Sequence, residues 1–327
     1  MKKIGIIGGG VWGSALAKLL SKNEVLIYAR DKGIASSINN HKFNPKLKYV
    51  VFNENVKSTF DIGEMQNLEF IFVALPSQNV RDVIQKLNKI HKNQKIIIAS
   101  KGIEIESKLF LYEVVKSVSN NKNICILSGP CFSNEVAQNL PTAVTLASKN
   151  RNLFKEVNSL FNSENFRLYY SEDLIGCQLG GAIKNIYAIA SGILLGMNLG
   201  ENAKSALIAR SFVEILRLGK VLGAQQNTLF GLSGLGDLIL TCNSLKSRNT
   251  SFGHLISSQP TISIHEHLKS LETTEGYYTV QAVNKIAQEK KIEMPIANSV
   301  YRILFEEKDI KEEIRKLMQR PIKDEFY

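Results

Sequence analysis

The fold is decided by one stretch near the start of the chain, Lys3-Ile4-Gly5-Ile6-Ile7-Gly8-Gly9-Gly10-Val11-Trp12-Gly13. A short apolar run leads directly into a G-x-G-x-x-G pattern, which opens the mostly apolar segment 15–20, and this is the context that the pattern requires. In such a turn Gly8 permits the sharp bend, Gly10 lets the backbone approach a pyrophosphate, and Gly13 lets the helix pack on the strand. The new helix offers its first N–H groups to the anion. The stretch therefore predicts the first strand, turn and helix of a Rossmann domain that binds NAD or NADP.

The residues after the second predicted strand, 24–29, address the choice between the two dinucleotides. An acidic residue there accepts from the ribose 2′-OH of NAD, whereas an arginine pairs with the 2′-phosphate of NADP. Arg30 and Asp31 are both present, and Arg30 comes first. We therefore expect NADP(H) to be preferred, with NAD(H) also accepted. The alternative is that Arg30 and Asp31 only cap the next helix.

The N-terminal half alternates short apolar strands with amphipathic helices, which is typical of a parallel sheet covered on both faces. Apolar residues at i, i+3, i+4 and i+7 predict helices over 80–87 and 111–118. The expected strands are 3–8, 24–29, 68–75, 95–100, 124–128, 143–147 and 166–170.

Beyond Tyr170 the strand pattern ends and the helical pattern continues. Four long helices are expected, over 173–200, 203–222, 277–291 and 295–306. With 327 residues, two domains are expected. The fold class is α/β, with an N-terminal Rossmann-type, mostly parallel sheet (residues 1–171) and an all-α C-terminal domain (172–327). Substrate is expected where the domains meet.

Composition excludes several classes of protein. The charge of +11 comes from scattered basic residues without a continuous stripe, so we do not expect nucleic acid as a partner. The four cysteines lack C-x-x-C spacing and histidine partners, so no metal site is expected and a reducing cytoplasm fits best. The longest charge-free apolar region, 185–200, is shorter than the roughly 20 residues of a membrane span and reads as a buried core helix.

Further motifs distinguish the chain from other dinucleotide-binding proteins. They are Ser100-Lys101-Gly102, Ser128-Gly129-Pro130-Cys131-Phe132, Gly180-Gly181-Ala182-Ile183-Lys184-Asn185, Gly231-Leu232-Ser233-Gly234-Leu235-Gly236-Asp237-Leu238, Ser247-Arg248-Asn249 and Glu275-Gly276. Together with the glycine turn, this set resembles bacterial NAD(P)-dependent glycerol-3-phosphate dehydrogenase, from Ile4 to about Gly276. The resemblance implies reduction of dihydroxyacetone phosphate to sn-glycerol 3-phosphate, the backbone of phospholipids.

The resemblance also assigns the catalytic residue. A ketone that accepts hydride becomes an alkoxide, so the site needs a cation or proton donor beside that oxygen. Lys184 suits the role, because partial burial at the start of an apolar helix would lower its pKa. The alternative is that Lys184 is not catalytic and extends from the end of the helix to solvent.

Binding residues follow from the same resemblance. The substrate set is Lys101, Gly129, Cys131, Lys184, Asp237, Ser247, Arg248 and Asn249. The cofactor set is Gly8, Gly10, Val11, Trp12, Gly13, Arg30, Lys101, Ser133, Arg248, Thr273 and Glu275. A phosphorylated substrate needs an anion clamp, and arginine with small polar neighbours supplies one.

Two residues depart from the family pattern. Cys131 stands where Ser or Thr is expected, and because a thiol is a poor donor the hydroxyl contact is in doubt. Ser133 replaces the usual Ala. The competing hypotheses are a β-hydroxyacid or 6-phosphogluconate type dehydrogenase, which the Gly-Leu-Gly-Asp and Ser-Arg-Asn blocks disfavour, and a non-enzymatic dinucleotide sensor. The sequence leaves the oligomeric state open, with a homodimer as one option.

Overall fold

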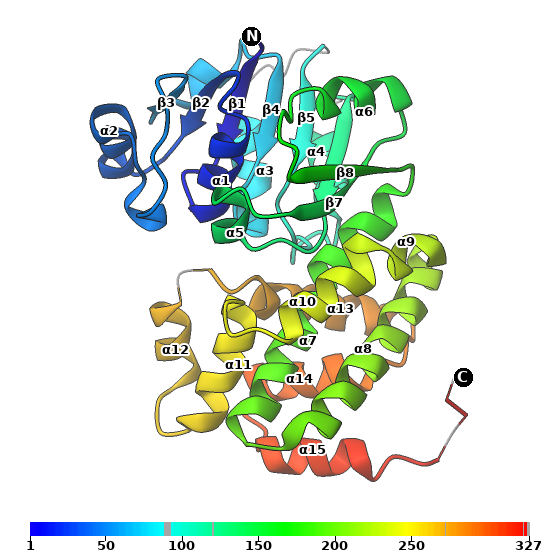
Figure 1. Ribbon diagram of the computed structural model, residues 1–327. Helices are drawn as coiled ribbons and strands as arrows, with labels where there is room; N and C mark the ends of the chain where they lie inside the picture. Colours follow the sequence, from blue (N-terminus) through cyan, green and yellow to red (C-terminus); the bar gives the residue numbers. More distant parts are fainter. Residues whose placement is uncertain (88–92, 120, 272, 323, 326–327) are drawn as a thin grey trace.

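The chain folds into a sheet domain that sits on a helical domain, as Figure 1 shows. The computed structural model describes residues 1–87, 93–119, 121–271, 273–322 and 324–325. The last strand ends at Ser171 and the first helix of the second domain begins at Leu174. The predicted boundary between residues 171 and 172 falls in this turn. It stays a prediction, because the first turn of that helix still packs with the sheet core.

The sheet has eight strands in the order β3-β2-β1-β4-β5-β6-β7-β8. All neighbours pair in parallel except β6 and β7, which are antiparallel. The predicted Rossmann-type, mostly parallel sheet is therefore confirmed, and its order reverses between β1 and β4, where such sheets bind their ligands. The strands are β1 (Lys3–Ile7), β2 (Glu24–Tyr28), β3 (Val56–Thr59), β4 (Phe70–Val73), β5 (Lys95–Ile98), β6 (Ile124–Ser128), β7 (Thr142–Ala147) and β8 (Phe166–Ser171).

Helices cover both faces of the sheet. Because successive strand residues point to opposite faces, Ile4 and Ile6 belong to one core cluster and Ile7 to the other. The first face is covered by α1 (Val11–Leu19), α2 (Lys32–His41), α5 (Ser133–Ala137) and α6 (Arg151–Asn158). The second face is covered by α3 (Val80–Lys86) and α4 (Leu111–Ser119). Short helical turns are η1 (Pro45–Leu47), η2 (Ile62–Met65) and η3 (Ser77–Asn79).

The prediction missed one strand, β3. Its sequence, Val56-Lys57-Ser58-Thr59, contains a single strongly apolar residue and lies at the sheet edge. Pairing with β2 defines this strand, and the sequence pattern alone does not.

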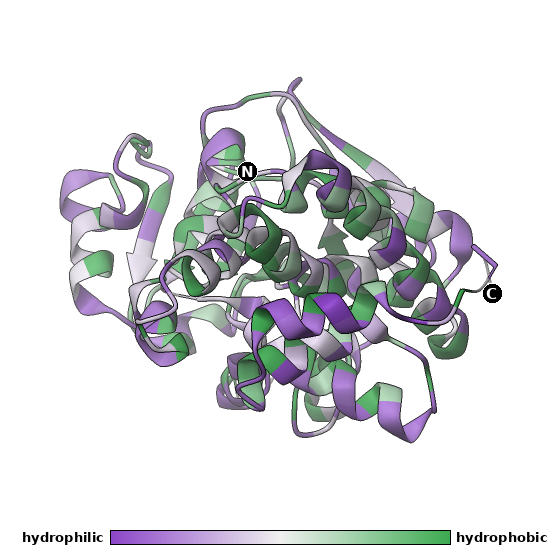
Figure 2. Cartoon of the chain, turned by 90° about the horizontal axis from the view of Figure 1, so that it is seen from below, coloured by the Kyte–Doolittle hydropathy of each residue, from purple (hydrophilic) through white to green (hydrophobic). Residues whose placement is uncertain are grey.

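The second domain is built around α7 (Leu174–Gly196), which is buried continuously from Gly176 to Ile193. Its other elements are α8 (Gly200–Leu222), α9 (Gln226–Phe230), the π-helical turn η4 (Leu232–Gly236), α10 (Asp237–Cys242), α11 (Arg248–Ser258), α12 (Ile264–Ser270), α13 (Glu275–Glu289), α14 (Pro295–Phe305) and α15 (Ile310–Met318). Outer helices show purple and green bands in Figure 2, as amphipathic helices do. The all-α domain is therefore confirmed.

Glycines let other elements approach the α7 backbone closely. A Cβ atom on Gly180 would overlap the carbonyl oxygen of Ser233 in η4, and one on Gly192 would overlap that of Thr250 in α11. Gly253 of α11 faces the Ile189 carbonyl oxygen in the same way. These contacts explain why α7 is rich in glycine although it is a helix interior.

The four long helices were predicted within a few residues, but α9, α10, α11, α12 and α15 were missed, and α12 and α15 carry clear signals. Ser263 and Glu266 form a capping box at the start of α12. Asp309 caps α15, in which Ile310, Ile314 and Leu317 have helical spacing.

Helix α7 is long and apolar enough, by length and composition alone, to cross a membrane. However, 89% of its most apolar window is buried inside the protein. It is the core helix of the second domain, as the sequence predicted.

A buried carboxylate fixes α14 to the rest of this domain. Glu214 of α8 is 2% exposed and accepts from the N–H groups of Ile296 and Ala297, at 2.6 and 3.2 Å. The Tyr187 hydroxyl of α7 donates to it as well, at 3.0 Å. Met294, the cap residue of α14, gives no side-chain bond, so Glu214 takes that role. Burial nevertheless raises the pKa of Glu214 to about 7.

The raised pKa predicts a pH-dependent stability. Between the ordinary value of 4.5 and about 7, folded Glu214 holds a proton that the unfolded chain releases. The free energy of unfolding should therefore fall as pH rises through this window, by up to about 3 kcal/mol. Urea unfolding of wild type and Glu214→Gln at several pH values measures the difference in slope. Glu201→Gln, which removes an exposed carboxylate of the same helix and its surface ion pair with Lys204, should nearly keep the wild-type slope, because surface pairs contribute little to stability. If the free energy of unfolding depended on pH equally in wild type and Glu214→Gln, the raised pKa of Glu214 would be contradicted.

Candidate active site

The glycine turn after β1 has the geometry that its sequence predicts. Gly8 has a φ of +135°, and a Cβ there would overlap the Ala74 carbonyl oxygen. A Cβ on Gly13 would overlap the carbonyl oxygen of Gly8, so the helix can pack on the strand only with glycine at this position. By contrast, nothing lies within 4 Å of a Cβ built on Gly10. The open space at Gly10 suits close approach by a ligand.

The start of α1 is suited to a phosphate group. The cap residue Gly10 has no side chain to accept from the first turn, and this turn carries no acidic residue. The N–H groups of Val11, Trp12 and Gly13 precede the first helical hydrogen bond, which Ser14 donates to Gly10. Unpaired N–H groups at a helix N-terminus bind anions such as the pyrophosphate of a dinucleotide. The described residues therefore fit the expected cofactor.

Two side chains hold this turn in place. The Trp12 indole donates to the Ala99 carbonyl oxygen at 3.0 Å, beyond the end of β5. Asn44 is fully buried and donates to the Gly9 carbonyl oxygen at 2.9 Å and to the Ser14 hydroxyl at 2.7 Å. The role of Asn44 was not anticipated, because it lies 35 residues from Gly9 in the sequence.

At the end of β2, Arg30 and Asp31 have different environments. One carboxylate oxygen of Asp31 accepts from the N–H groups of Gly33 and Ile34, at 2.8 and 3.2 Å, and so caps α2. Asp31 therefore caps the helix, while the role of Arg30 stays a prediction. Arg30 is exposed and follows the carboxyl end of β2.

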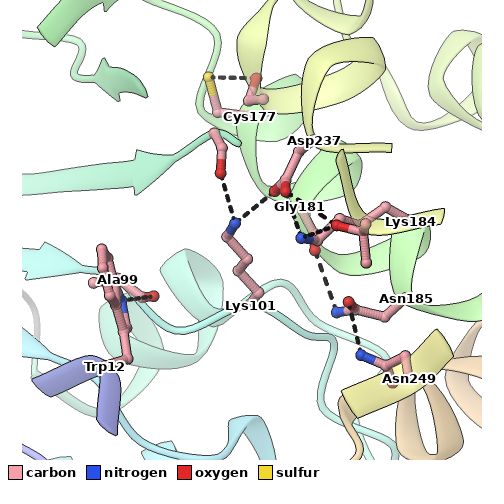
Figure 3. A network of polar contacts seen from close by, with 12 residues as sticks. Trp12, Ala99, Lys101, Cys177, Gly181, Lys184, Asn185, Asp237 and Asn249 are labelled. Atoms are coloured by element: carbon pink, nitrogen blue, oxygen red, sulfur yellow. Dashed lines mark hydrogen bonds and ion pairs between the residues drawn. The ribbon is translucent and has the colours of Figure 1, made fainter. Parts of the chain in front are cut away.

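Three predicted residues meet at the junction of the domains, as Figure 3 shows. Asp237 is fully buried and lies between Lys101 and Lys184. Lys101 Nζ donates to Asp237 Oδ2 at 2.5 Å and to the Gly129 carbonyl oxygen at 2.9 Å. Lys184 Nζ donates to Asp237 Oδ1 and, at 2.7 Å, to the Thr241 hydroxyl. The structure thus joins residues that are as much as 136 positions apart.

Each member of this cluster comes from a different element. Lys101 follows β5, at the carboxyl edge of the sheet. Lys184 lies in the middle of α7, where its side chain is 8% exposed. Asp237 is the first residue of α10 and is placed by η4, which packs against Gly180 of α7. The predicted position of Lys184 at the start of a helix is wrong, since α7 begins ten residues earlier, at Leu174.

Burial and charge give the two lysines different pKa values. For Lys184, loss of solvation is the largest effect and lowers the pKa to about 8, with the charge of Lys101 in the same direction and Asp237 opposing both. Burial also acts on Lys101, but the attraction of Asp237 and its other partners raises the pKa of Lys101. Lys101 is thus a permanent cation, whereas Lys184 can exchange a proton near neutral pH.

Thr241 is a member of the cluster that sequence reasoning missed. It is 3% exposed, and its carbonyl oxygen accepts from the Thr250 hydroxyl at 2.7 Å. Its spacing of four residues from Asp237 places both on one face of α10, and this spacing could have revealed it.

The segment after β6 lies against the same cluster. Gly129 is buried and accepts from Lys101. Burial raises the pKa of the Cys131 thiol, while the charges of Lys101 and Lys184 lower it, so the thiol is within reach of their electric field. Ser133 begins α5 and is half-buried. The hydroxyl of Ser128 is buried beside Gly181 and has no hydrogen-bond partner within the described residues.

The Ser247-Arg248-Asn249 block begins α11. The Ser247 hydroxyl accepts from the Thr250 N–H at 3.3 Å and caps the helix. Asn249 donates to Asn185 Oδ1 at 3.0 Å and accepts from the Gly276 N–H at 2.8 Å, so it connects α11 with α7 and α13. Arg248 is exposed at the first helical position.

Glu275 and Thr273 lie just before or at the start of α13. Both carboxylate oxygens of Glu275 accept from Ser77, from its N–H at 2.9 Å and its hydroxyl at 2.6 Å. Burial raises the pKa of Glu275, and the bonds from Ser77 and the charge of Arg248 oppose this rise. Thr273 is half-buried.

The arrangement provides an anion site at α1, a fixed cation at Lys101 and a proton donor at Lys184. Two of the three N–H groups of Lys184 bind Asp237 and Thr241, which leaves the third for a substrate oxygen. Among the described residues, no group of three or more His, Cys, Asp or Glu side chains could hold a metal ion. The cluster can therefore protonate a carbonyl oxygen while a bound dinucleotide reacts at the carbon.

Comparison with known proteins agrees with this chemistry. Two family models match the chain, the N-terminus (residues 3–154) and the C-terminus (residues 173–315) of NAD-dependent glycerol-3-phosphate dehydrogenase. The chain is 41% identical over 329 residues to glycerol-3-phosphate dehydrogenase [NAD(P)+] of Thermotoga sp. (strain RQ2), covering 98% of each. It is 37% identical over 325 residues to the Zymomonas mobilis protein of the same name, covering 99% of this chain and 94% of that one. A crystal structure of glycerol-3-phosphate dehydrogenase from Coxiella burnetii has 35% identity and a TM-score of 0.93, over 98% of this chain and 99% of that one.

Proposed function

The chain belongs to the NAD-dependent glycerol-3-phosphate dehydrogenase family, and we propose how its own residues carry out the reaction. It is an NAD(P)-dependent oxidoreductase that interconverts dihydroxyacetone phosphate and sn-glycerol 3-phosphate. The observation that carries the assignment of residues is the buried Lys101–Asp237–Lys184 cluster at the carboxyl edge of the sheet.

Lys184 is the proton donor in the direction of reduction. A dinucleotide held by the glycine turn and the start of α1 would supply the hydride that the C2 carbonyl carbon of the substrate accepts. As the C–O double bond becomes single, negative charge develops on the oxygen, and Lys184 Nζ transfers a proton to it. A lysine with a pKa of about 8 is mostly charged at neutral pH and yet gives up its proton readily. In the reverse direction neutral Lys184 accepts the hydroxyl proton.

Asp237 and Lys101 prepare Lys184 for this step. The carboxylate orients the ammonium group and keeps it charged, because without Asp237 two buried cations would face one another. Lys101 retains its own charge and can stabilise the developing alkoxide. Removing water from the closed cluster strengthens both effects.

The substrate phosphate lies by the start of α11 in this proposal. Arg248 offers a guanidinium group there, and the helix N-terminus offers backbone N–H groups. Ser247 and Asn249 shape this site through their bonds within α11 and to Gly276. Gly129 and Cys131 form the opposite wall, with a weaker donor at Cys131 than a hydroxyl would be.

We propose NADP(H) as the preferred cofactor, with NAD(H) also accepted. An NAD-specific site needs a carboxylate that is free to accept from the ribose 2′-OH. One Asp31 oxygen caps α2 and the other can accept from a ribose hydroxyl, which suits NAD(H), whereas the exposed Arg30 can pair with a 2′-phosphate, which favours NADP(H).

The competing dehydrogenase classes and the dinucleotide sensor are disfavoured by the same comparisons, since relatives at 37% to 41% identity are glycerol-3-phosphate dehydrogenases.

We also propose that the protein is a cytoplasmic homodimer. All four cysteines are free thiols, which suits a reducing compartment. Several apolar side chains of the second domain are exposed, among them Leu195, Leu199, Ile239 and Leu245, and a second copy could cover them. Light scattering coupled to size-exclusion chromatography should give twice the chain mass of 36.5 kDa, and the mass of one chain would reject the dimer.

The function is tested by following oxidation of NADPH and NADH in the presence of dihydroxyacetone phosphate. Lys184→Ala should lower kcat about a thousandfold, because the developing alkoxide loses its proton donor, while NADPH still binds. For the wild type, kcat of reduction should decline above about pH 8, as Lys184 loses its proton. Lys285→Ala, which truncates an exposed lysine of α13, should behave as wild type. Substantial turnover by Lys184→Ala would reject the proton-donor role.

The cofactor preference is tested with Arg30→Ala. Loss of a charged hydrogen bond to the 2′-phosphate should raise KM for NADPH roughly tenfold to a hundredfold. KM for NADH and kcat with either cofactor should change little, because NADH lacks the 2′-phosphate. Equal increases in KM for NADPH and NADH would contradict the assignment of Arg30.

A further inference from the structure

The loop after β4 carries a buried serine that no part of the mechanism above uses. Ser77 is 1% exposed and donates both its N–H and its hydroxyl to the carboxylate of Glu275. Glu275 lies 198 residues later in the sequence and belongs to the other domain. Gln78 supports the contact, since its amide donates to the Ser77 hydroxyl at 3.0 Å and to the Ile103 carbonyl oxygen at 2.8 Å.

This loop forms one wall of the crevice where the strand order reverses. A Cβ atom on Gly8 would overlap the carbonyl oxygen of Ala74, the residue that follows β4. The loop after β4 therefore borders the glycine turn. On the other side, the Leu75 N–H donates to the Ser100 hydroxyl at 2.9 Å, next to Lys101. A dinucleotide bound in the crevice would therefore lie along the segment that contains Ser77.

A third segment packs against the same pair. A Cβ on Gly102 would overlap the Ser77 side chain and would lie 2.9 Å from Glu275 Oε2. Gly102 follows Lys101 directly. The loops after β4 and β5 and the start of α13 thus meet at one point, which only glycine at position 102 allows.

Hydrogen bonds continue from Glu275 to the helix of the catalytic lysine. The Gly276 N–H, next to Glu275, donates to Asn249 Oδ1 at 2.8 Å. Asn249 Nδ2 donates to Asn185 Oδ1 at 3.0 Å, and Asn185 is adjacent to Lys184 in α7. Figure 3 shows the Asn249 and Asn185 part of this series beside Lys184.

We propose that Ser77 is a positioning residue. Through its bonds to Glu275, it holds the loop after β4, which borders the cofactor crevice, at the correct distance from α7, the helix that carries Lys184. Hydride transfer requires the dinucleotide and the proton donor to be held on either side of one substrate carbon. The cofactor is positioned by the sheet domain and Lys184 by the helical domain. Ser77 and Glu275 join the two where they meet. The proposal deepens the proposed function, because it rests on Lys184 as the proton donor.

The chemistry of the contact supports a strong and directional link. Hydrogen bonds to a carboxylate are about twice as strong as those between neutral groups, and two from a single residue fix the orientation. Glu275 is half-buried by area, but burial of its carboxylate is sufficient to raise its pKa, and the bonds from Ser77 counteract this effect. Without the Ser77 hydroxyl, the second carboxylate oxygen of Glu275 loses its bond, and the Ser77 N–H alone no longer fixes the orientation of the carboxylate.

Ser77→Ala is the direct test. It removes one charge-assisted hydrogen bond, so kcat/KM for dihydroxyacetone phosphate should fall roughly tenfold to a hundredfold. Ser77→Cys, which keeps the size and has a weaker donor, should lie between wild type and Ser77→Ala. The matched control is Ser58→Ala, which removes a buried serine hydroxyl bonded to the Ile27 carbonyl oxygen in the same domain. Ser58→Ala should leave kcat/KM within about twofold of wild type.

A double-mutant cycle separates positioning from a general loss of stability. If Ser77 acts through Glu275, Ser77→Ala should change kcat/KM by less than about twofold when Glu275→Gln is already present. The urea midpoint of the cofactor-free protein should show the same lack of additivity. If Ser77→Ala changed kcat/KM equally in the wild type and in Glu275→Gln, the proposal would be overturned. A kcat/KM of Ser77→Ala within twofold of wild type would also overturn it.

The affinity for NADPH, measured by fluorescence without turnover, distinguishes this proposal from the proposed function. Absence of NADPH oxidation by the wild type with dihydroxyacetone phosphate would reject the proposed function, and the cycle could still be measured on NADPH binding. Additive effects in a fully active enzyme would reject only the role of Ser77.

Discussion

The carboxylate of Asp237 is the interaction on which the rest of the site depends. Two ammonium groups, those of Lys101 and Lys184, meet in a space that excludes most water, and their repulsion would separate the domains without an anion between them. Because Asp237 is fully buried, its attraction is little screened. Burial lowers the pKa of Lys184 to about 8 against the attraction of Asp237, whereas the same attraction helps to raise the pKa of Lys101. Asp237 therefore holds both lysines in place, and burial makes Lys184 the one that can exchange a proton.

Close backbone packing makes this contact possible. Helix α7 can carry Lys184 to the edge of the sheet only because glycine at 180 and 181 admits η4 on one side and Ser128 on the other. The turn η4 then starts α10 with Asp237 directed at Lys184. At the opposite wall, Gly8 and Gly102 bring the loop after β4 against the glycine turn and against Glu275. In both domains, glycine thus allows close approach of backbone segments, in addition to its usual role in turns.

Much of the fold could be predicted because its signals are local. The strand-turn-helix of residues 3–20 follows from apolar periodicity and three spaced glycines, and seven of the eight strands were predicted from segments rich in apolar or β-branched residues. Strand β3 could not be found this way, since pairing with β2 defines it. The site residues Lys101, Lys184 and Asp237 were identified by resemblance to a family, and their residue types alone left each with an unremarkable alternative. Thr241 could have been found from its helical spacing to Asp237.

Periodicity, glycine spacing and motifs are properties of short segments, so they were sufficient to predict a dinucleotide fold, an all-α partner domain and a set of candidate residues. What those residues contact depends on how the whole chain packs. Asp31 caps α2, Glu275 binds Ser77 across the domain junction, and Asp237 bridges two lysines. Hydrogen-bond partners and pKa values depend on burial and on which distant segments meet. That information arises when the two domains pack against each other, and no single segment contains it.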